Sequence, residues 1–280
     1  MKIKILSDST CDLPQWLLEE KDITMMPLTV IKNDEAFLDC VTITPAEIFD
    51  HVEKGGNLCS TSAVSVGEYM DQFEALTGEY DGIVHISLGS GFSASYQNAC
   101  LAAQEFENVF VVDSQNLSTG QGLVVLKACE LAQQGLDGAQ IKQQLDAFTG
   151  KVEASFVVDK LDYLVKGGRC SSAAALGANL LNLKPCIEVK NGKMTVGKKY
   201  RGSYAKCLGS YVKERLSGRE DLDSGILFVT KTEVSEEAYS TVMEAVGTYG
   251  SFETVYETTA GCTISCHCGP GTLGILFVRK

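Results

Sequence analysis

The sequence predicts an α/β protein of two lobes, a mainly parallel α/β/α sheet lobe followed by an α+β lobe. Short apolar runs alternate with helical patterns across residues 1–150, and their short connections are typical of a parallel sheet covered on both faces. Near Gly150 this alternation ends, and the hairpin signal Asn191-Gly192 follows among further helices. A chain of 280 residues that is 45% hydrophobic can fill two lobes. We therefore expect lobes at residues 1–150 and 151–280.

In the first lobe, we expect a strand wherever a short apolar run is bounded by turn residues. These runs cover residues 2–6, 25–31, 83–86 and 109–112. The clearest helix start is Thr44-Pro45-Ala46-Glu47, which places an N-cap, a proline at the first helical position and an acidic residue at the third. Apolar residues at helical spacing predict helices over residues 45–54, 66–76, 92–106, 117–134 and 139–148. Residues 59–65, rich in Ser and Thr, are expected to form a loop.

In the second lobe, the expected strands and helices are mixed without strict alternation. Strands are predicted at residues 152–158, 187–189, 194–198, 226–230, 252–256 and 273–278. Helices are predicted at residues 161–165, 171–181, 204–216 and 233–246. Residues 262–271 are rich in Cys, His and Gly, and we expect them to form a loop before the closing strand.

The bulk properties exclude several classes of function. The formal net charge of −12 argues against a nucleic-acid or anionic-membrane partner, since either would require a basic face. The first residues lack the apolar core of a signal peptide, and no apolar run approaches the roughly 18 residues of a membrane span. We therefore expect a cytoplasmic protein without stable membrane anchoring. The eleven cysteines are scattered and mostly lie within apolar runs, so buried reduced thiols are expected.

The segment from residue 81 to residue 103 organises the chain as a strand, a Gly/Ser-rich turn and a helix. The turn Gly89-Ser90-Gly91 directs backbone N–H groups and hydroxyls at the space above the helix N-terminus. That position favours an anion, because the unpaired N–H groups and the helix dipole both attract negative charge. We interpret Ser93 as the main hydroxyl of this anion-binding turn.

Two alternative functions stay open on these residues alone. Gly89-x-Gly91-x-x-Ala94 fits a dinucleotide fingerprint, with Asp113 where the ribose-binding acid would lie, which indicates an NAD-binding oxidoreductase. Ser93 also half-fits a nucleophile elbow, with His267 as base and Asp113 as the orienting acid, which indicates a serine acyl hydrolase. In that elbow a serine replaces the second glycine.

The cysteine-rich stretch is a candidate metal site by composition. Cys262, Cys266, His267 and Cys268 are soft ligands within seven residues. Adjacent ligands in a short loop cannot all reach one tetrahedral zinc ion, and the usual C-x2-C knuckle is absent. We therefore predict packed thiols here, and no metal.

Other polar residues have both a binding and a structural interpretation. His267 stands in the expected loop before Cys-Gly-Pro-Gly, and loops held by rigid turns often carry sites. Arg169 follows two glycines and could donate bidentately to a carboxylate or phosphate, or form a surface ion pair. Thr61, Ser62 and Ser65 could bind a ligand or cap the helix that follows.

Eight short motifs follow one another along nearly the whole chain. They are S-D-S-T-C-D-L-P at 7–14, M-P-L at 26–28, T-S-A-V-S at 61–65, I-S-L-G-S-G-F-S-A-S-Y-Q-N-A at 86–99, V-D-S at 112–114, L-V-K-G-G-R at 164–169, K-P at 184–185 and H-C-G-P-G at 267–271. In order and spacing the chain resembles the DegV family, whose members bind fatty acids. Some members act as the acyl-carrying subunit of bacterial fatty acid kinase, the FakB role.

The resemblance implies a two-lobed α/β protein with an acyl chain buried in its interior and no other cofactor. It assigns the fatty carboxylate to Thr61 and Ser93, with Ser62 beside them and His267 near the same head group. Arg169, and Arg201 in a similar part, are expected to face a partner kinase or the phosphoryl group.

The resemblance also implies a division of labour between two proteins. The sequence has no P-loop motif, so an ATP-dependent kinase partner would phosphorylate the bound acid to an acyl phosphate. The chain itself is then expected to be a lipid carrier and not an enzyme. Two positions depart from the family pattern: Val64 stands where a proline is common, and Ala94 where a glycine is common.

Overall fold

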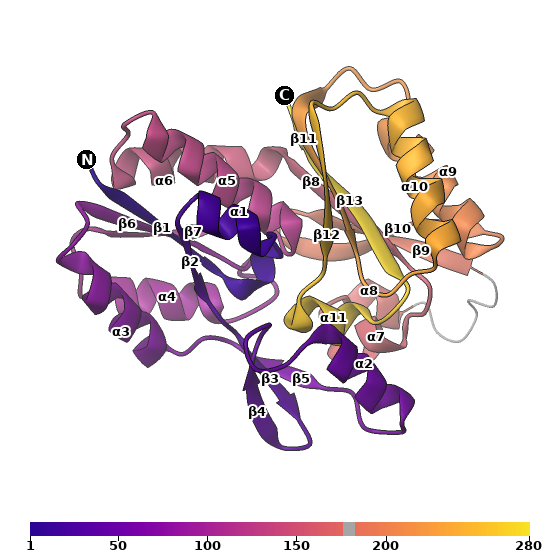
Figure 1. Ribbon diagram of the computed structural model, residues 1–280, viewed down its shortest axis with the longest axis horizontal. Coiled ribbons are helices and arrows are strands. Elements are labelled where there is room, and N and C mark those ends of the chain that lie inside the picture. The colour runs from indigo at the N-terminus through magenta and orange to yellow at the C-terminus, as the bar shows by residue number, and fades with distance from the viewer. Residues whose placement is uncertain (176–182) are drawn as a thin grey trace.

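The structure is a computed structural model of the chain, and it describes residues 1–175 and 183–280 (Figure 1). Strands of the described residues form a four-stranded, a six-stranded and a three-stranded sheet. The four-stranded sheet is built before residue 114 and the six-stranded sheet after residue 151. The four-stranded sheet is parallel and the six-stranded sheet is mixed, which confirms the predicted α/β class. The lobe boundary between residues 150 and 151 stays a prediction.

The parallel sheet has the strand order β2-β1-β6-β7. Its strands are β1 (Ile3–Asp8), β2 (Ile23–Met26), β6 (Gly82–Ser87) and β7 (Val109–Asp113). Each neighbouring pair runs parallel, as predicted. β6 is buried along its whole length, which explains why its sequence is a nearly continuous apolar run and not an alternating one.

Helices cover both faces of the parallel sheet (Figure 1). On one face lie α1 (Gln15–Glu20), α5 (Thr119–Gln133) and α6 (Gly138–Phe148). On the other face lie α3 (Val66–Thr77) and α4 (Ser95–Ala103). Two separate apolar clusters, one on each face, accompany these helices.

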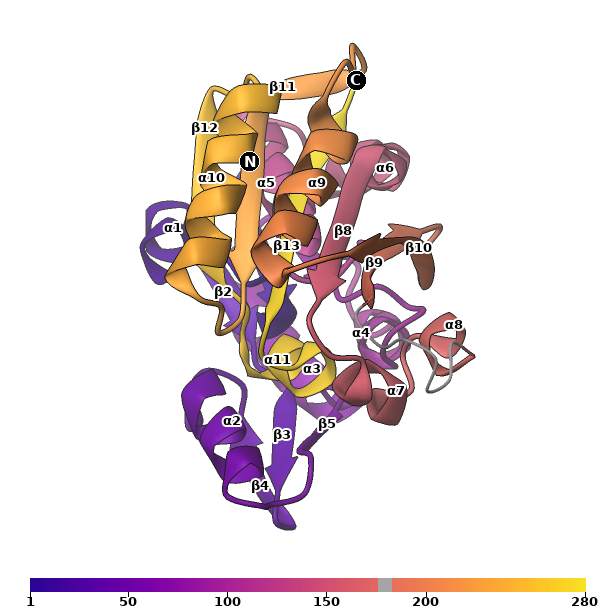
Figure 2. The same ribbon diagram turned by 90° about the vertical axis from the view of Figure 1, so that its right-hand side faces the viewer.

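The mixed sheet has the strand order β10-β9-β8-β13-β11-β12. Its strands are β8 (Val152–Val158), β9 (Leu183–Lys190), β10 (Lys193–Arg201), β11 (Leu222–Lys231), β12 (Thr254–Thr259) and β13 (Thr272–Arg279). Asn191 and Gly192, with φ of 51° and 69°, join β9 to β10, which confirms the predicted hairpin. Figure 2 shows α9 (Tyr204–Leu216) and α10 (Glu236–Tyr249) side by side over one face of this sheet. Helix α5 contacts β8 and β13 and therefore lies between the two large sheets.

The three-stranded sheet shows that the single strand predicted at residues 25–31 is wrong. Its strands, in the order β4-β3-β5, are β3 (Thr29–Lys32), β4 (Glu35–Leu38) and β5 (Ser60–Ser62). Pro27 separates β2 from β3, and these two strands belong to different sheets. Asn33 and Asp34 join β3 to β4 with φ of 51° and 63°, the left-handed values of a type I′ turn. Residues 59–65, predicted as a loop, contain β5.

Shorter helices complete the described chain. They are α2 (Pro45–Glu53), α7 (Asp162–Gly167), α8 (Ser171–Ala174) and α11 (Cys262–Cys268), with 3-10 turns at Ser9–Cys11 and Thr149–Lys151. Thr44 and Glu47 form the capping box of α2 that the sequence predicted. The loop expected at residues 262–271 is wrong, because α11 occupies most of it. Helix 171–181 is confirmed as far as Ala174, and residues 176–181 of that prediction lie outside the described residues.

All eleven cysteines are free thiols, and nine of them are buried, in agreement with the expectation of reduced, packed thiols. Cys100 is half-buried, and Cys40 is exposed. Within the part of the chain that the structure covers, no helix is both long enough and apolar enough to cross a bilayer.

Candidate functional site

A small cavity of about 40 Å³ lies where β5, the loop between β6 and α4, the end of α7, and α11 meet. Its polar lining comes from Thr61, Ser93, Arg169, Thr263 and His267. The rest of its wall is formed by Leu28, Ala63, Leu88, Phe92, Leu117, Met194, Ile264 and Cys268. Hydroxyls, an imidazole and a guanidinium therefore face an otherwise apolar space, and four residues predicted from the sequence share it.

Strand β5 brings Thr61 to the cavity and turns Ser62 away, because successive side chains of a strand point to opposite faces. Thr61 Oγ1 lies 2.8 Å from Nε2 of His267, which stands 206 positions later in the chain. Ser62 is exposed, and its Oγ lies 3.5 Å from the carbonyl oxygen of Ala63. The structure thus joins Thr61 to His267 and leaves Ser62 at the surface.

His267 lies on α11 and not in the loop that the sequence predicted. Its Nδ1 is buried and has no hydrogen-bond partner among residues 1–175 and 183–280, and this atom packs so closely against Gly167 that a Cβ at that glycine would lie 2.6 Å from it. Burial, and then the positive charge of Arg169, lowers the pKa of His267 to about 4. The imidazole is therefore neutral near pH 7 and can donate one hydrogen bond from one ring nitrogen.

Ser93 lies in the loop that connects β6 to α4, and it is half-buried. Its Oγ accepts a hydrogen bond from the N–H of Ser95 at 3.1 Å and lies 2.9 Å from Ser95 Oγ. The loop is tied to the next one, since the N–H of Gly89 donates to the carbonyl of Asn116 at 2.9 Å. These bonds fix Ser93 beside the first turn of α4.

The two predicted arginines lie in different places. Arg169 follows Gly168, whose φ of +70° ends α7, and its Nη1 donates to the carbonyl of Gly167 at 2.8 Å. Its side chain is exposed, yet it reaches the cavity wall. Arg201 is exposed at the end of β10, opposite Leu183, and does not line the cavity.

The structure gives no support to the dinucleotide alternative. The Asp113 carboxylate accepts hydrogen bonds from Ser90 N–H at 3.0 Å, Ser90 Oγ at 2.6 Å and Gln115 N–H at 2.9 Å, so it is engaged in bracing its own loops. A Cβ on Gly91 would lie 2.1 Å from the carbonyl oxygen of Gly192. The β9–β10 turn therefore occupies the space that a pyrophosphate would need at this glycine.

The hydrolase alternative also lacks its constellation. His267 contacts Thr61 through Nε2, the nitrogen that would have to accept a proton from the Ser93 hydroxyl. Asp113 is engaged with Ser90 and is not the orienting partner of this histidine. Ser93, His267 and Asp113 are therefore not connected as nucleophile, base and orienting acid within the described residues.

Sequence reasoning missed the importance of Asp8 for positioning the site. Its buried carboxylate accepts hydrogen bonds from Tyr69 Oη at 2.5 Å, Ser87 Oγ at 2.7 Å and the N–H of Leu88 at 2.8 Å. Nε2 of His85 lies 3.2 Å from the same carboxylate. Although burial opposes ionisation, His85, Tyr69 and Ser87 hold the pKa of Asp8 below its usual value. The network fixes the end of β6 where Leu88 lines the cavity.

A second cavity of about 30 Å³ continues the apolar interior toward the mixed sheet. It shares Leu117, Ile264 and Cys268 with the first cavity. Most of its other wall residues lie on strands β8, β9, β11 and β13, and they include Phe156 and Leu276. The polar site therefore borders a discontinuous apolar path along α11.

Fold and site together define a class: an α/β protein with one parallel and one mixed sheet, in which a hydroxyl- and imidazole-lined site borders an apolar interior. The model of the DegV family, described as an uncharacterised protein family, matches residues 2–280, so the chain belongs to the DegV family. The family resemblance seen in the sequence motifs is thereby confirmed.

Similar proteins are described as lipid binders. Protein DegV of Bacillus subtilis (strain 168) is 32% identical over 286 residues, and the match covers 100% of both chains. A DegV family protein from Thermus thermophilus, whose structure is described by its fatty acid binding, has a TM-score of 0.90 at 29% identity, with 100% of both chains covered. A DegV lipid-binding protein from Thermotoga maritima has a TM-score of 0.83 at 30% identity, again with 100% of both chains covered.

Proposed function

We propose that this protein binds a long-chain fatty acid, with the carboxylate at Thr61, Ser93 and His267 and the tail buried in the interior. A separate ATP-dependent kinase then phosphorylates the carboxylate, and the protein holds the acyl phosphate. The observation that carries the proposal is the 2.8 Å contact between Thr61 and His267 at the wall of an otherwise apolar cavity. The fatty acid binding described for similar proteins supports the same ligand.

Neutral donors suit a carboxylate that must later react. A desolvated carboxylate needs several hydrogen bonds, each worth roughly 1.5–3 kcal/mol when the acceptor is charged. Thr61 and Ser93 offer hydroxyl donors, and the single N–H of neutral His267, placed on Nε2, donates to Thr61 Oγ1 and leaves the Thr61 hydroxyl hydrogen for the carboxylate. Arg169, the cation at the cavity wall, is exposed to solvent that screens its charge, so the carboxylate keeps its own charge available for attack on a phosphoryl group.

The tail requires the interior to repack. A water molecule needs roughly 10–15 Å³ of such space, so cavities of about 40 and 30 Å³ hold only a few water-sized groups. Phe92 and Met194 line the first cavity and would move aside, and an unbranched Met side chain adapts readily. Burying a tail of about 16 carbons at ~0.8 kcal/mol per methylene gives at most ~12 kcal/mol to drive this change.

We assign contact with the kinase to the two exposed arginines. Arg169 reaches both the cavity wall and the solvent, so its guanidinium can contact a phosphoryl group that arrives from a partner. Arg201, at the end of β10, would contact the partner kinase and not the head group. We place this exchange in the cytoplasm, where a soluble kinase and its ATP are found together.

Ligand identity and head-group contacts are tested together. Extraction of the purified protein under denaturing conditions, followed by mass spectrometry, should recover a long-chain fatty acid. Thr61→Val keeps the side-chain shape, and this change and Ser93→Ala should each weaken fatty acid affinity about 10- to 150-fold, the equivalent of one charge-assisted hydrogen bond. Ser62→Ala is the matched control, because that neighbouring hydroxyl faces away from the cavity. Equal affinity in all three variants would contradict the proposed head-group site.

The kinase step has its own variant. Arg169→Ala should stop acyl phosphate formation when the loaded protein is mixed with ATP and a fatty acid kinase subunit. Fatty acid affinity should fall less than in Thr61→Val, because Arg169 is exposed. Normal acyl phosphate formation by Arg169→Ala would exclude the assigned role.

A further inference from the structure

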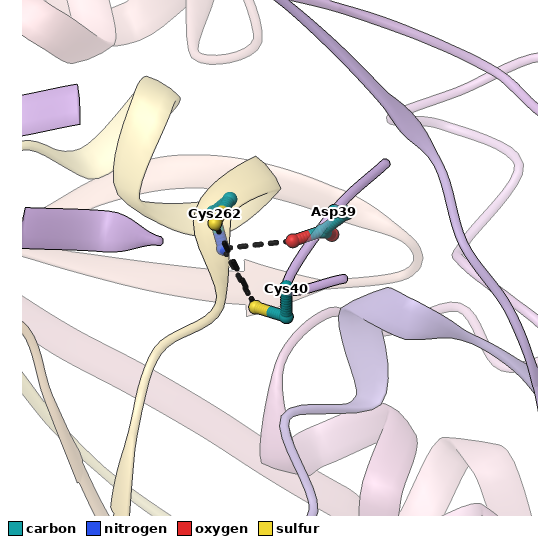
Figure 3. Close-up of side chains that lie close together, drawn as sticks. All are labelled: Asp39, Cys40 and Cys262. Carbon is teal, nitrogen blue, oxygen red and sulfur yellow. Dashed lines mark hydrogen bonds between the residues drawn. The ribbon is translucent and has the colours of Figure 1, made fainter. Parts of the chain in front are cut away.

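Apart from the lipid cavity, two cysteines and an aspartate meet at the start of α11 (Figure 3). Asp39 and Cys40 come from the connection between β4 and α2, and Cys262 is the first residue of α11. The Sγ atoms of Cys40 and Cys262 lie 3.7 Å apart, although the residues are 222 positions apart in sequence. One ligand atom from each of the three residues lies within 4.8 Å of the other two.

We propose that Asp39, Cys40 and Cys262 form a binding site for a divalent cation of the zinc class. Two thiolates and a carboxylate are ligands that favour zinc over the hard cations magnesium and calcium. Thiolates held about 2.3 Å from zinc at a tetrahedral angle lie about 3.8 Å from each other. The observed separation of 3.7 Å matches this value, so the sulfur atoms need almost no rearrangement.

Hydrogen bonds already orient the Asp39 carboxylate and the sulfur atom of Cys40. Oδ1 of Asp39 accepts the N–H groups of Cys262 at 2.8 Å and Thr263 at 3.3 Å, while Ser9 Oγ donates to Oδ2 at 2.7 Å. The bond from the Cys262 thiol to the carbonyl of Ile43, at 3.2 Å, is given up when this thiol loses its proton, whereas the N–H of Cys262 donates to Cys40 Sγ at 3.4 Å and is retained. Outer partners of this kind hold metal ligands in place. When the ion binds, both thiols release their protons to solvent, so two protons leave for each ion bound.

The cluster has an entry path from solvent. Asp39 and Cys40 line an open cleft of about 490 Å³, together with Ser9, Asp12 and Glu257. Asp39 and Cys262 are buried, but Cys40 is exposed and faces this cleft. The carboxylate of Glu257 at the cleft and the net charge of −12 attract cations. The three protein ligands leave the fourth tetrahedral position to a solvent molecule from the cleft.

The ion would connect two segments that meet only in the folded chain. Cys262 begins the helix that carries His267, five residues further on. An ion bound here therefore anchors that helix to the connection between β4 and α2. The cation site itself does not depend on fatty acid binding, and it can be tested on the protein without lipid.

The test is zinc titration of the full-length protein in a thiol reductant, in competition with a chromophoric chelator. We expect one zinc ion per chain, and with cobalt in its place a thiolate-to-metal charge-transfer band in the near ultraviolet. Cys40→Ser should weaken zinc binding by at least about 100-fold, since even an outer partner of a ligand is worth about 10- to 100-fold. Cys100→Ser, which removes a half-buried thiol on α4, should bind zinc as the unmodified protein does.

Cys40→Ser is chosen so that a loss of zinc binding cannot be explained by misfolding. Cys40 is exposed, so Cys40→Ser leaves the bonds from Asp39 to α11 in place, and circular dichroism should match that of the unmodified protein. Cys262→Ser, at a buried position, should lose zinc binding to a similar extent. The proposal is overturned if Cys40→Ser binds zinc undiminished, or if the cobalt-loaded protein lacks the thiolate band.

Discussion

Replacing His267 with glutamine should change how stability depends on pH. The pKa of His267 falls from 6.5 to about 4 in the folded chain, because the ring is buried beside Arg169. Between these two values the unfolded chain binds a proton at this residue and the folded chain does not. Stability therefore falls as the pH drops through about 6.5, and this loss is complete below about 4. At 1.36 kcal/mol for each pKa unit, the loss is about 3 kcal/mol.

Glutamine cannot titrate, so His267→Gln should escape this loss. Urea unfolding of both proteins at about pH 7, 5.5 and 4 isolates it, because carboxylate contributions common to both proteins cancel in the difference. We expect the variant to gain about 3 kcal/mol relative to the unmodified protein over this range. In parallel, the NMR signals of the His267 ring should titrate with a midpoint near pH 4. A stability difference that stays constant with pH would refute the reasoning.

Three further predictions concern packing and ligand linkage. Gly91→Ala should destabilise the protein by about 1–3 kcal/mol, because the new Cβ would lie 2.1 Å from the Gly192 carbonyl oxygen. Gly247→Ala, on an open face of α10, should instead stabilise the protein by about 0.5–1 kcal/mol. Denaturant unfolding of both variants checks the two values. Tyr69→Phe should cost about 1.5–3 kcal/mol in the same assay, because it removes the hydrogen bond to buried Asp8, and a cost near zero would contradict the described network. A long-chain fatty acid at about 100 times its Kd should raise the free energy of unfolding by about 2.7 kcal/mol, and no shift of the unfolding midpoint would argue against ligand binding.

The parts of the fold that the sequence predicts correctly are those with local signals. Helix α9 was predicted at its observed bounds, because its apolar period and its Ser203 N-cap lie within a few residues of each other. The Asn191-Gly192 turn is equally local, since both residues take the positive φ that this hairpin needs. Asn33-Asp34 makes a similar turn, but an aspartate is a weaker signal than glycine at the second position, and the hairpin was missed.

Helix α11 shows why the remaining parts were not predictable. Its seven residues are flanked by Gly261 and Gly269, and they include β-branched residues that favour helix only weakly. The carboxylate that accepts its first N–H group belongs to Asp39, 223 positions earlier in the chain. No local window of sequence contains that contact, so the segment resembles a loop until the chain is folded.

The candidate site also has one part that a local sequence signal predicts and one part that depends on distant contacts. Ser93 was identified from its own turn, because strand, glycines and helix start are adjacent in sequence. The contact between Thr61 and His267 spans 206 positions, and spacing alone says nothing about it. The resemblance to a family implies only that both residues lie near one head group, and the structure places the two atoms within hydrogen-bonding distance. The cluster of Cys40 and Cys262 has no local signal, and sequence reasoning assigned Cys262 to a packed group of thiols.

The strand order of the mixed sheet has a consequence for biosynthesis. β13 occupies an inner position, between β8 and β11, yet it is translated after every other strand of that sheet. Because a ribosome extends the chain from its N-terminus, the nascent protein holds two incomplete ribbons, β10-β9-β8 and β11-β12, with unpaired edges. Release of the last segment closes both edges at once. Premature termination before residue 272 would leave these ribbons apart and expose them to aggregation and proteolysis.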